Sequence, residues 1–221
     1  MMADAGQRTY KQVARAQAQQ RTREALLDAA NEELSKDGWS RASLEAVAAK
    51  AGVTKQTVLR HFGSKEGLIE AAIRHISEIV RRERARAPIG DLPGAVRNLM
   101  DHYERWGDLV MRALAEEHRT PLVRRITDRG REVHSEWVAQ TFEPQLAKLS
   151  GETRERRMAQ LVAVCDVYVW KLLRRDIKLG VPEAETALVE LVERLVEPDA
   201  AQRERKGKPP SQAPSRRHYQ A

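Results

Sequence analysis

Apolar residues recur every three or four positions along almost the whole chain, which is the spacing of one face of an α-helix. No segment shows the strict apolar and polar alternation, bounded by turn residues, that a half-buried strand would have. Residues 7–37 lack glycine and proline, and Leu26, Leu27 and Leu34 share one face of that stretch. We therefore predict an all-α protein that begins with one long helix, whose Gln- and Arg-rich N-terminal part is exposed.

Glycine, proline and capping residues divide the rest of the pattern into further helices. A short helix begins after Ser43 and ends near Gly52, another begins at Thr54, and a longer one begins at about Lys65. After a loop rich in proline and glycine, the expected helices cover approximately residues 94–105, 108–118, 121–142, 152–179 and 182–196. The chain thus changes from short helices to long ones, which predicts a small N-terminal helical domain followed by a larger helical bundle.

Residues 44–61, with the sequence LEAVAAKAGVTKQTVLRH, have the spacing of a helix-turn-helix. Two steeply crossed helices need a small residue where they approach each other, and Ala48 supplies it. The turn needs a residue that adopts a positive φ angle, and Gly52 follows four positions later. Apolar anchors flank the turn at Val47, Ala51, Val53 and Val58.

The polar side chains of the second helix in this unit lie opposite Val58 and Phe62, which we expect to point inward. Such a face fits the major groove of DNA, where Arg and Lys bond to guanine and Gln bonds to adenine. The residues predicted to contact DNA are Thr22, Ser43, Thr54, Lys55, Gln56, Thr57, Arg60, His61 and Lys65. The alternative is that Thr54 only caps its helix and that His61 is an ordinary surface or boundary residue.

These residues divide into two roles. Base reading is assigned to Lys55, Gln56 and Arg60. Phosphate binding is assigned to Ser43, Thr54, Thr57, His61 and Lys65. Backbone N–H groups in the first turn of the helix that begins near Lys65 add to the attraction for phosphate.

The sequence over roughly residues 23–73 resembles the DNA-binding domain of the TetR family of transcriptional regulators. The most specific part is the family pattern Thr-Leu-Tyr-x-His-Phe-x-x-Lys-Glu-x-Leu. It is matched here by Thr57, Val58, Leu59, Arg60, His61, Phe62, Lys65, Glu66 and Leu68. Leu59 stands where the family usually has Tyr, so a hydroxyl that often contacts the DNA backbone is absent.

The resemblance implies properties that the spacing alone does not. The positions that commonly contact DNA in the family are those of Lys55, Gln56, Thr57, Arg60, His61 and, at a phosphate, Lys65. It implies a homodimer on a palindromic double-stranded DNA operator, because two half-sites about one helical turn apart need two recognition helices. It also implies a C-terminal domain that binds a small-molecule effector and moves the recognition helices apart, and most often a repressor.

A wide apolar stripe in residues 157–180, repeated over residues 181–195, predicts burial against both the core and a second subunit. The residues predicted at this dimer interface are Val162, Cys165, Val169, Leu172, Leu188, Leu191 and Leu195. The alternative is a thick core within one chain. Cys165 has no histidine near it in sequence and is interpreted as a small core residue rather than a nucleophile.

Bulky and polar residues on three predicted helices are candidates for an effector pocket, which a helical bundle builds from apolar walls and a few polar groups. They are His102, Tyr103, Trp106, Met111, Arg112, His134, Trp137 and Phe142. Ordinary core packing is the alternative for each of them.

Charge and composition narrow the function classes. The chain has 39 Lys and Arg against 32 Asp and Glu, a net charge of +7 that favours a polyanionic partner. Its single cysteine excludes an intramolecular disulfide, and the absence of an apolar run of about 18 residues argues against a membrane span. We therefore expect a cytoplasmic protein that does not enter a membrane.

The basic ends of the chain are a further candidate for DNA contact. Arg21 with Thr22 would meet a phosphate, and Arg8, Lys11 and Arg15 would reach the flanking minor groove. The alternative is a solvated helix face. The predicted parts are a basic arm or helix extension (residues 1–22), a helix-turn-helix DNA-binding domain (23–70), a ligand-binding and dimerisation domain (71–197) and a disordered basic tail (198–221).

An enzyme and a helical interaction module are the two alternative function classes. An enzyme is disfavoured because the sequence lacks a zinc-protease motif, a Gly-rich phosphate loop, a Cys pair and a serine-hydrolase elbow. We accordingly predict no catalytic residue, no metal site and no cofactor. A helical interaction module that has lost DNA binding is consistent with Leu59, but Lys55, Arg60 and Lys65 argue against it.

Overall fold

The computed structural model describes residues 3–37 and 41–197, and every regular element in these residues is helical. The predicted all-α fold is confirmed. The helices in chain order are α1 (Ala3–Asp37), α2 (Leu44–Lys50), α3 (Lys55–Phe62), α4 (Lys65–Arg84), α5 (Leu92–Glu116), α6 (Pro121–Thr141), α7 (Glu143–Leu146), α8 (Gly151–Val164), α9 (Val167–Lys171), the π-helix η1 (Leu172–Asp176) and α10 (Val181–Val196). The predicted tail, residues 198–221, lies outside the described residues.

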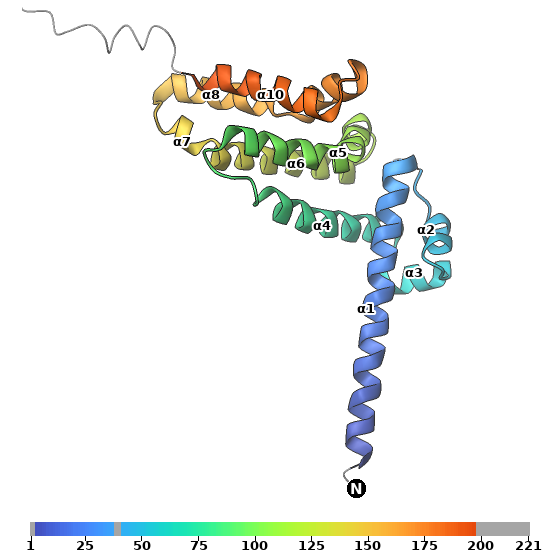
Figure 1. Cartoon of the computed structure of the whole chain (residues 1–221). Helices are drawn as coiled ribbons and strands as arrows, with labels where there is room; N and C mark the ends of the chain where they lie inside the picture. The colour runs from blue at the N-terminus through green and yellow to red at the C-terminus, as the bar shows by residue number, and fades with distance from the viewer. Residues whose placement is uncertain (1–2, 38–40, 198–221) are drawn as a thin grey trace, which may run out of the picture.

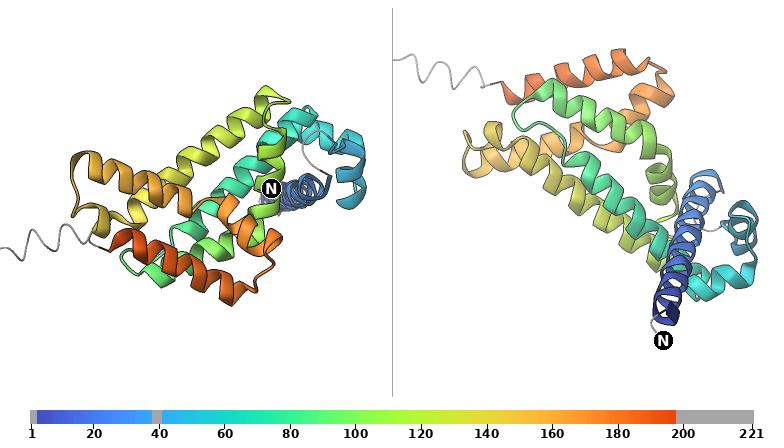
Figure 2. Two further views of the ribbon diagram at one scale, coloured as in Figure 1. Left: turned by 90° about the horizontal axis from the view of Figure 1, so that it is seen from above. Right: turned by 60° about the horizontal axis from the view of Figure 1, so that its bottom comes forward.

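The helices form a small N-terminal unit and a larger bundle that share α4. Figure 1 shows α1 crossing one end of α4 steeply, with α2 and α3 beside it. Beyond α4 come α5 and α6, and then α8 and α10. The N-terminal half of α1 projects away from the other helices, as the turned views in Figure 2 also show. The side chains of residues 12–21 are accordingly exposed, as the polar composition of this stretch predicts.

Two apolar clusters hold these parts together. Leu26, Leu34, Val47 and Val58 form the centre of the first, and each is at most 1% exposed. The same cluster includes Leu109 from α5, so the N-terminal unit is packed onto the bundle. The second cluster fills the bundle and contains the fully buried side chains Leu99, Met100, Phe142, Leu146, Leu161 and Trp170. Helix α4 therefore lies between the two cores.

The structure has one helix, α5, where the sequence predicts two, residues 94–105 and 108–118. Gly107 lies inside α5 and is buried rather than marking a break. A Cβ atom at this position would lie 2.5 Å from Cζ3 of Trp170. The glycine is therefore explained by the close approach of an aromatic ring, which periodicity cannot reveal.

The predicted helix over residues 152–179 is wrong, because the chain breaks it after α8. The Oδ1 atom of Asp166 accepts a hydrogen bond from the Tyr168 N–H at 3.0 Å and starts α9 anew. The helix then widens into η1. Asp166 therefore acts as a cap inside a stretch whose apolar spacing continues without interruption.

Candidate nucleic-acid interface

Helices α2 and α3 form the predicted helix-turn-helix. The Ser43 hydroxyl caps α2 by accepting the Ala46 N–H at 3.0 Å, and Ala48 is buried where the helices approach. Gly52 in the turn has φ of +67°, which confirms the prediction of a positive φ angle there. These local features fix the direction in which α3 leaves the turn.

Helix α3 presents polar side chains to solvent while one apolar residue anchors it. Val58 is fully buried, whereas Lys55, Gln56 and Arg60 are exposed. Phe62, also expected to point inward, is half-buried, and the Arg23 guanidinium of α1 lies 4.8 Å from its ring centre. The three predicted base readers thus share an accessible helix whose other side is held by packing.

Thr54 caps α3, as one of the two interpretations of this residue expects. Its Oγ1 accepts the Thr57 N–H at 3.2 Å, and the two hydroxyl oxygens are 3.0 Å apart. Ser64 caps α4 in the same way through the Gly67 N–H at 3.0 Å. The two caps fix where α3 and α4 begin, and the remaining N–H groups of each first turn point out of the helix start.

Lys55 is not isolated on this surface, because its Nζ lies 2.6 Å from Oε1 of Glu45 on α2. The hydrogen bond from Lys55 lowers the pKa of the Glu45 carboxyl group below its usual value. Without DNA the lysine therefore faces a carboxylate, and a base contact requires exchange of that partner. The sequence signal for this pair was the charge of Glu45 ten positions before the lysine, which only the turn brings close.

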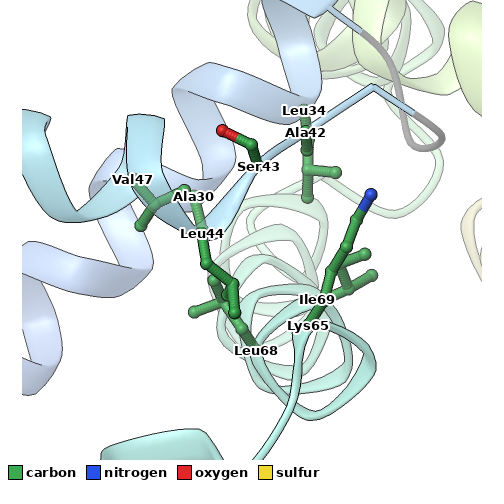
Figure 3. A pocket seen from close by; sticks show the side chains of 9 residues that line it. All are labelled: Ala30, Leu34, Ala42, Ser43, Leu44, Val47, Lys65, Leu68 and Ile69. Carbon is green, nitrogen blue, oxygen red and sulfur yellow. The ribbon is translucent and has the colours of Figure 1, made fainter. Parts of the chain in front are cut away.

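Ser43 and Lys65 lie at a small depression between α1, α2 and α4, which Figure 3 shows from close by. Apolar side chains line most of it: Ala30, Leu34, Ala42, Leu44, Val47, Leu68 and Ile69. Its interior volume of about 10 Å³ holds no more than one water molecule. The depression is a packing feature of the N-terminal unit, and it is too small for an organic ligand.

Thr22 lies within the uninterrupted helix α1, and its hydroxyl donates to the Ala18 carbonyl at 3.0 Å. The donor is therefore used within α1, so a phosphate contact by Thr22 requires the hydroxyl to rotate. His61 is half-buried at the end of α3, 6.0 Å from the Phe62 ring centre.

Four of the predicted pocket residues meet around Arg84, which the sequence pattern did not single out. His102 and Tyr103 come from α5, His134 and Trp137 come from α6, and all four are less than 9% exposed. The Arg84 side chain, at the end of α4, is 6% exposed, and its guanidinium carbon lies 4.8 Å from the Trp137 ring centre and 5.7 Å from that of Tyr103. We call these five residues the arginine cluster.

The histidines of the arginine cluster are held in the neutral form. Arg84 Nη1 lies 3.5 Å from His134 Nδ1, and His134 Nε2 lies 3.0 Å from the Val162 carbonyl oxygen. Because arginine only donates and a carbonyl only accepts, the proton of this imidazole is on Nε2. Burial lowers the pKa of His134, and burial together with the Arg84 charge lowers the pKa of His102 well below its usual value. The positive charge of the cluster is therefore that of Arg84.

The other four predicted pocket residues do not join the arginine cluster. Phe142 is fully buried behind Trp137, edge-on at 6.1 Å between ring centres. Trp106 packs against the other apolar cluster and donates to Glu83 Oε2 at 3.1 Å. Met111 is half-buried at the bundle core, and Arg112 is exposed. Helical spacing could have identified Arg84, because it follows Ile76 and Val80 by eight and four positions on the buried face of α4.

Two residues of the predicted dimer interface lie inside the core of a single chain. Cys165 is 1% exposed and Leu188 is 2% exposed within the chain, so its own helices cover both side chains, and a contact of either with a partner stays a prediction. The wide stripe predicted here packs partly against α5, which explains their burial. Burial also raises the pKa of the Cys165 thiol to about 12, in keeping with its interpretation as a core residue.

Other members of the predicted interface remain accessible. Leu172 is 51% exposed and Leu191 is 46% exposed, and Tyr168, which was not predicted, is 52% exposed. Val162, Val169 and Leu195 are half-buried.

Two other kinds of site are not found among the residues that the structure describes. No group of His, Cys, Asp or Glu side chains in these residues lies close enough together to hold a metal ion. None of the described helices combines the length and the apolar composition that a membrane span needs.

Comparisons with known proteins agree with this geometry. A family model described as bacterial regulatory proteins of the tetR family matches residues 26–72. No curated protein sequence matches the chain. Several solved structures, however, have a similar fold. A transcriptional regulator from Rhodococcus sp. RHA1 has a TM-score of 0.63 at 18% identity, covering 79% of this chain and 96% of its own.

Two further solved structures resemble the chain over a similar share. Salmonella enterica GusR has a TM-score of 0.62 at 21% identity and covers 80% of this chain and 95% of its own. A TetR-like transcriptional regulator from Rhodococcus sp. RHA1 has a TM-score of 0.53 at 20% identity, covering 78% and 94%. At these identities the likeness concerns the fold, which extends through both the N-terminal unit and the bundle.

Proposed function

We propose that the chain, whose residues 26–72 match the tetR family of bacterial regulatory proteins, is a ligand-responsive repressor. In this proposal it binds a palindromic operator as a homodimer in the cytoplasm and leaves the operator when a small-molecule effector binds. It has no catalytic activity of its own. DNA binding and transcription regulation follow from the family, whereas repression, the dimer and the effector are proposed.

The exposed polar face of α3 carries the DNA-binding part of the proposal. Lys55, Gln56 and Arg60 are accessible together, while the buried Val58 and the Thr54 cap keep the helix in place. An eight-residue helix held in this way can enter the major groove and present three long polar side chains to base edges. The net charge of +7 adds attraction to the phosphate backbone.

Exposed apolar side chains support the homodimer. Leu172 of η1, Leu191 of α10 and Tyr168 of α9 are each about half exposed, so a partner that covers them would remove apolar surface from water. A second copy that covers them would place two α3 helices in one particle. Light scattering of the full chain tests this: the proposal expects a mass of about twice 25.1 kDa and a monomer for Leu172→Glu with Leu191→Glu.

Helix α4 supports a link between the bundle and the DNA-binding unit. It begins at Lys65 beside α3 and ends at Arg84 inside the bundle. Its 20 residues form one helix about 30 Å long, and the described part of α4 contains no break. An effector that displaces the Arg84 end would therefore shift the start of α4 and with it α3.

Leu59 is the observation that favours a second candidate, a helical interaction module without DNA binding. The residue is half-buried and offers no hydroxyl to a phosphate. Both candidates share the fold and differ in what the surface of α3 binds.

Sequencing of the genomic DNA fragments that the purified full-length protein retains distinguishes the two. The proposed function expects enrichment of one palindromic motif near a few genes, followed by a gel shift with that motif alone. Retention without a shared motif, and no shift with any recovered fragment, would favour the interaction module and overturn the regulator.

A further inference from the structure

The arginine cluster contains a buried cation whose partners within the described chain are the neutral side chains of His134 and Tyr103. Arg84 is 6% exposed and forms no ion pair with any described residue. Its Nη1 reaches the neutral His134 ring across a long 3.5 Å, and its buried Nε has no hydrogen-bond partner. His102 Nδ1 is also buried and unpartnered. Buried polar groups are normally satisfied, so an unpartnered Arg84 Nε and an unpartnered His102 Nδ1 within the same cluster favour a ligand that would pair with them.

The surroundings compensate the charge of Arg84 only in part. The Asp166 charge offsets a small part of the lowering that burial imposes on the pKa of His134, but its Oδ1 accepts the Tyr168 N–H and it forms no ion pair with Arg84 within the described chain. The carbonyl groups at the end of α4 carry partial negative charge. One of them, that of Arg84 itself, already accepts from Trp137 Nε1 at 3.3 Å. None of these groups gives the free Nε an acceptor.

We propose that the effector is a small organic carboxylate, bound through its anionic group by Arg84 and His102. The planar guanidinium suits a carboxylate, and His102 can donate from Nδ1 because its neutral ring carries one proton. The rings of Tyr103 and Trp137 lie beside the guanidinium and can pack against the apolar part of an organic ligand. An inorganic anion has no apolar part that could contact these rings. This inference rests on the proposed function, because it names the chemistry of the effector.

Binding at this place would act directly on α4. The cluster is closed to solvent, so a carboxylate enters only when the Arg84 end of α4 separates from α5 and α6. A carboxylate between Arg84 and His102 also needs room between α4 and α5, so it would favour an arrangement in which the Arg84 end of α4 stands further from α5, and such a preference shifts the equilibrium between the two arrangements. The same helix begins at Lys65, beside the predicted DNA surface.

The experiment measures the thermal midpoint Tm of the full-length protein with matched probes at about 10 mM. The pairs are benzoate with benzamide, phenylacetate with phenylacetamide, and hexanoate with hexanamide, and sulfate and phosphate represent inorganic anions. The proposal expects at least one carboxylate to raise Tm by about 3 °C or more, and its amide to have little effect. Equal shifts for acid and amide, no shift from any carboxylate, or an equal shift from sulfate or phosphate would overturn it.

Substitution of the arginine supplies the second test. Arg84→Met replaces an unpaired buried charge by an apolar chain, so Tm without ligand should stay the same or rise while the response to carboxylate disappears. Arg86→Met, which removes an exposed charge two positions later, should keep the response. If Arg84→Met does not fold, Arg84→Lys should fold and lose most of the response, because it keeps the charge but not the planar fork. A full response in either Arg84 variant would contradict the proposal.

Operator release separates this inference from the proposed function. With a DNA fragment recovered by genomic selection, the active carboxylate should lower the affinity of the wild type at least tenfold and leave Arg84→Met bound. If the wild type binds DNA but no carboxylate changes Tm or release, the inference fails and the regulator stands. If the wild type binds no DNA but shows the acid-specific Tm shift, the site stands and the proposed regulation fails.

Discussion

Helix α3 and the end of α4 both carry arginine, and they hold it in opposite surroundings. Arg60 is exposed on α3, where water solvates its charge. Arg84 lies in the bundle among the aromatic and histidine side chains of α5 and α6. The free-energy cost of removing water from the charged group is small for Arg60 and large for Arg84. The exposed Arg60 can therefore attract a polyanion such as DNA. The buried Arg84 is unfavourable unless a partner with opposite charge binds it.

The difference also extends to the neighbouring carboxylates. On the α3 surface Lys55 has an exposed partner, Glu45, and exposed pairs of this kind exchange easily for phosphate. In the bundle Glu104 is instead held by Arg174 Nε at 2.6 Å and Trp170 Nε1 at 2.8 Å, and the Arg174 hydrogen bond lowers the pKa of this carboxyl group. The Lys55 pair on the surface can thus rearrange, whereas Glu104 in the bundle is held by two partners at once.

The packing of the bundle, on which this contrast depends, should be most sensitive to substitution of Gly107. In Gly107→Ala the new Cβ would lie 2.5–2.9 Å from three atoms of the fully buried Trp170 ring, which stands 6.1 Å from the Tyr103 ring. We expect a loss of about 3 kcal/mol in the free energy of unfolding, measured by urea denaturation. Gly130→Ala is the matched control, because nothing lies within 4 Å of its added Cβ, and it should stabilise by about 0.5–1 kcal/mol. Equal behaviour of the two variants would show that the bundle is loosely packed.

Cations of the predicted DNA surface should affect DNA binding, and the exposed Arg60 should contribute little to stability. Arg60→Ala is expected to lower affinity for the preferred sequence by about 10- to 100-fold and to relax the preference at one base position. Lys65→Ala should weaken all sequences alike, because a phosphate contact carries no base information. Fluorescence anisotropy with the motif and single-base variants measures both. A uniform loss for Arg60→Ala would remove it from the base-reading role.

The projecting part of α1 gives a smaller effect that depends on salt. A chain that starts at Gln20 lacks Arg15 and the earlier basic residues and should show a shallower salt dependence of operator affinity. Each lost phosphate contact lowers the slope of log affinity against log salt by about 0.9. Removal of residues 198–221 is the comparison truncation and should change the slope less. An unchanged slope in the first truncation would exclude the arm from the DNA interface.

The smallest expected effect concerns the partner of Lys55. Glu45→Gln removes a carboxylate close to the DNA surface and frees the lysine, so operator affinity should rise by about two- to fivefold at low salt. Glu132→Gln on α6, which removes an exposed partner of Arg129 far along the chain, should leave affinity unchanged. A decrease for Glu45→Gln would mean that the carboxylate positions Lys55 for its contact.

Local patterns explain why the N-terminal unit could be predicted in detail. The Ser43 cap, the positive φ of Gly52 and the buried position of Val58 each depend on a few neighbouring residues. Three-residue cap spacing and the period of the helix are visible in the sequence itself. The same short-range rules gave the all-α class and the exposed N-terminal half of α1.

The break at Asp166 and the continuity of α5 at Gly107 could not be predicted in this way. Aspartate often caps a helix and glycine often ends one, but their roles here depend on which helices pack beside them. The same limit applies to Cys165 and Leu188, which their own chain covers. A wide apolar stripe does not tell which part of it a helix of the same chain will cover.

The helical class, the helix-turn-helix and the polar face of α3 can be predicted from the order of the residues, because they follow from interactions over a few positions. The burial of Arg84 beside His134, 50 positions later, and the hydrogen bond from Tyr103 to the carbonyl of Cys165, 62 positions later, depend on how the helices pack. Burial depends on contacts between helices distant in sequence, and the free energy of a charge depends on burial. The arginine cluster is therefore a property of the folded bundle that no segment of the chain carries alone.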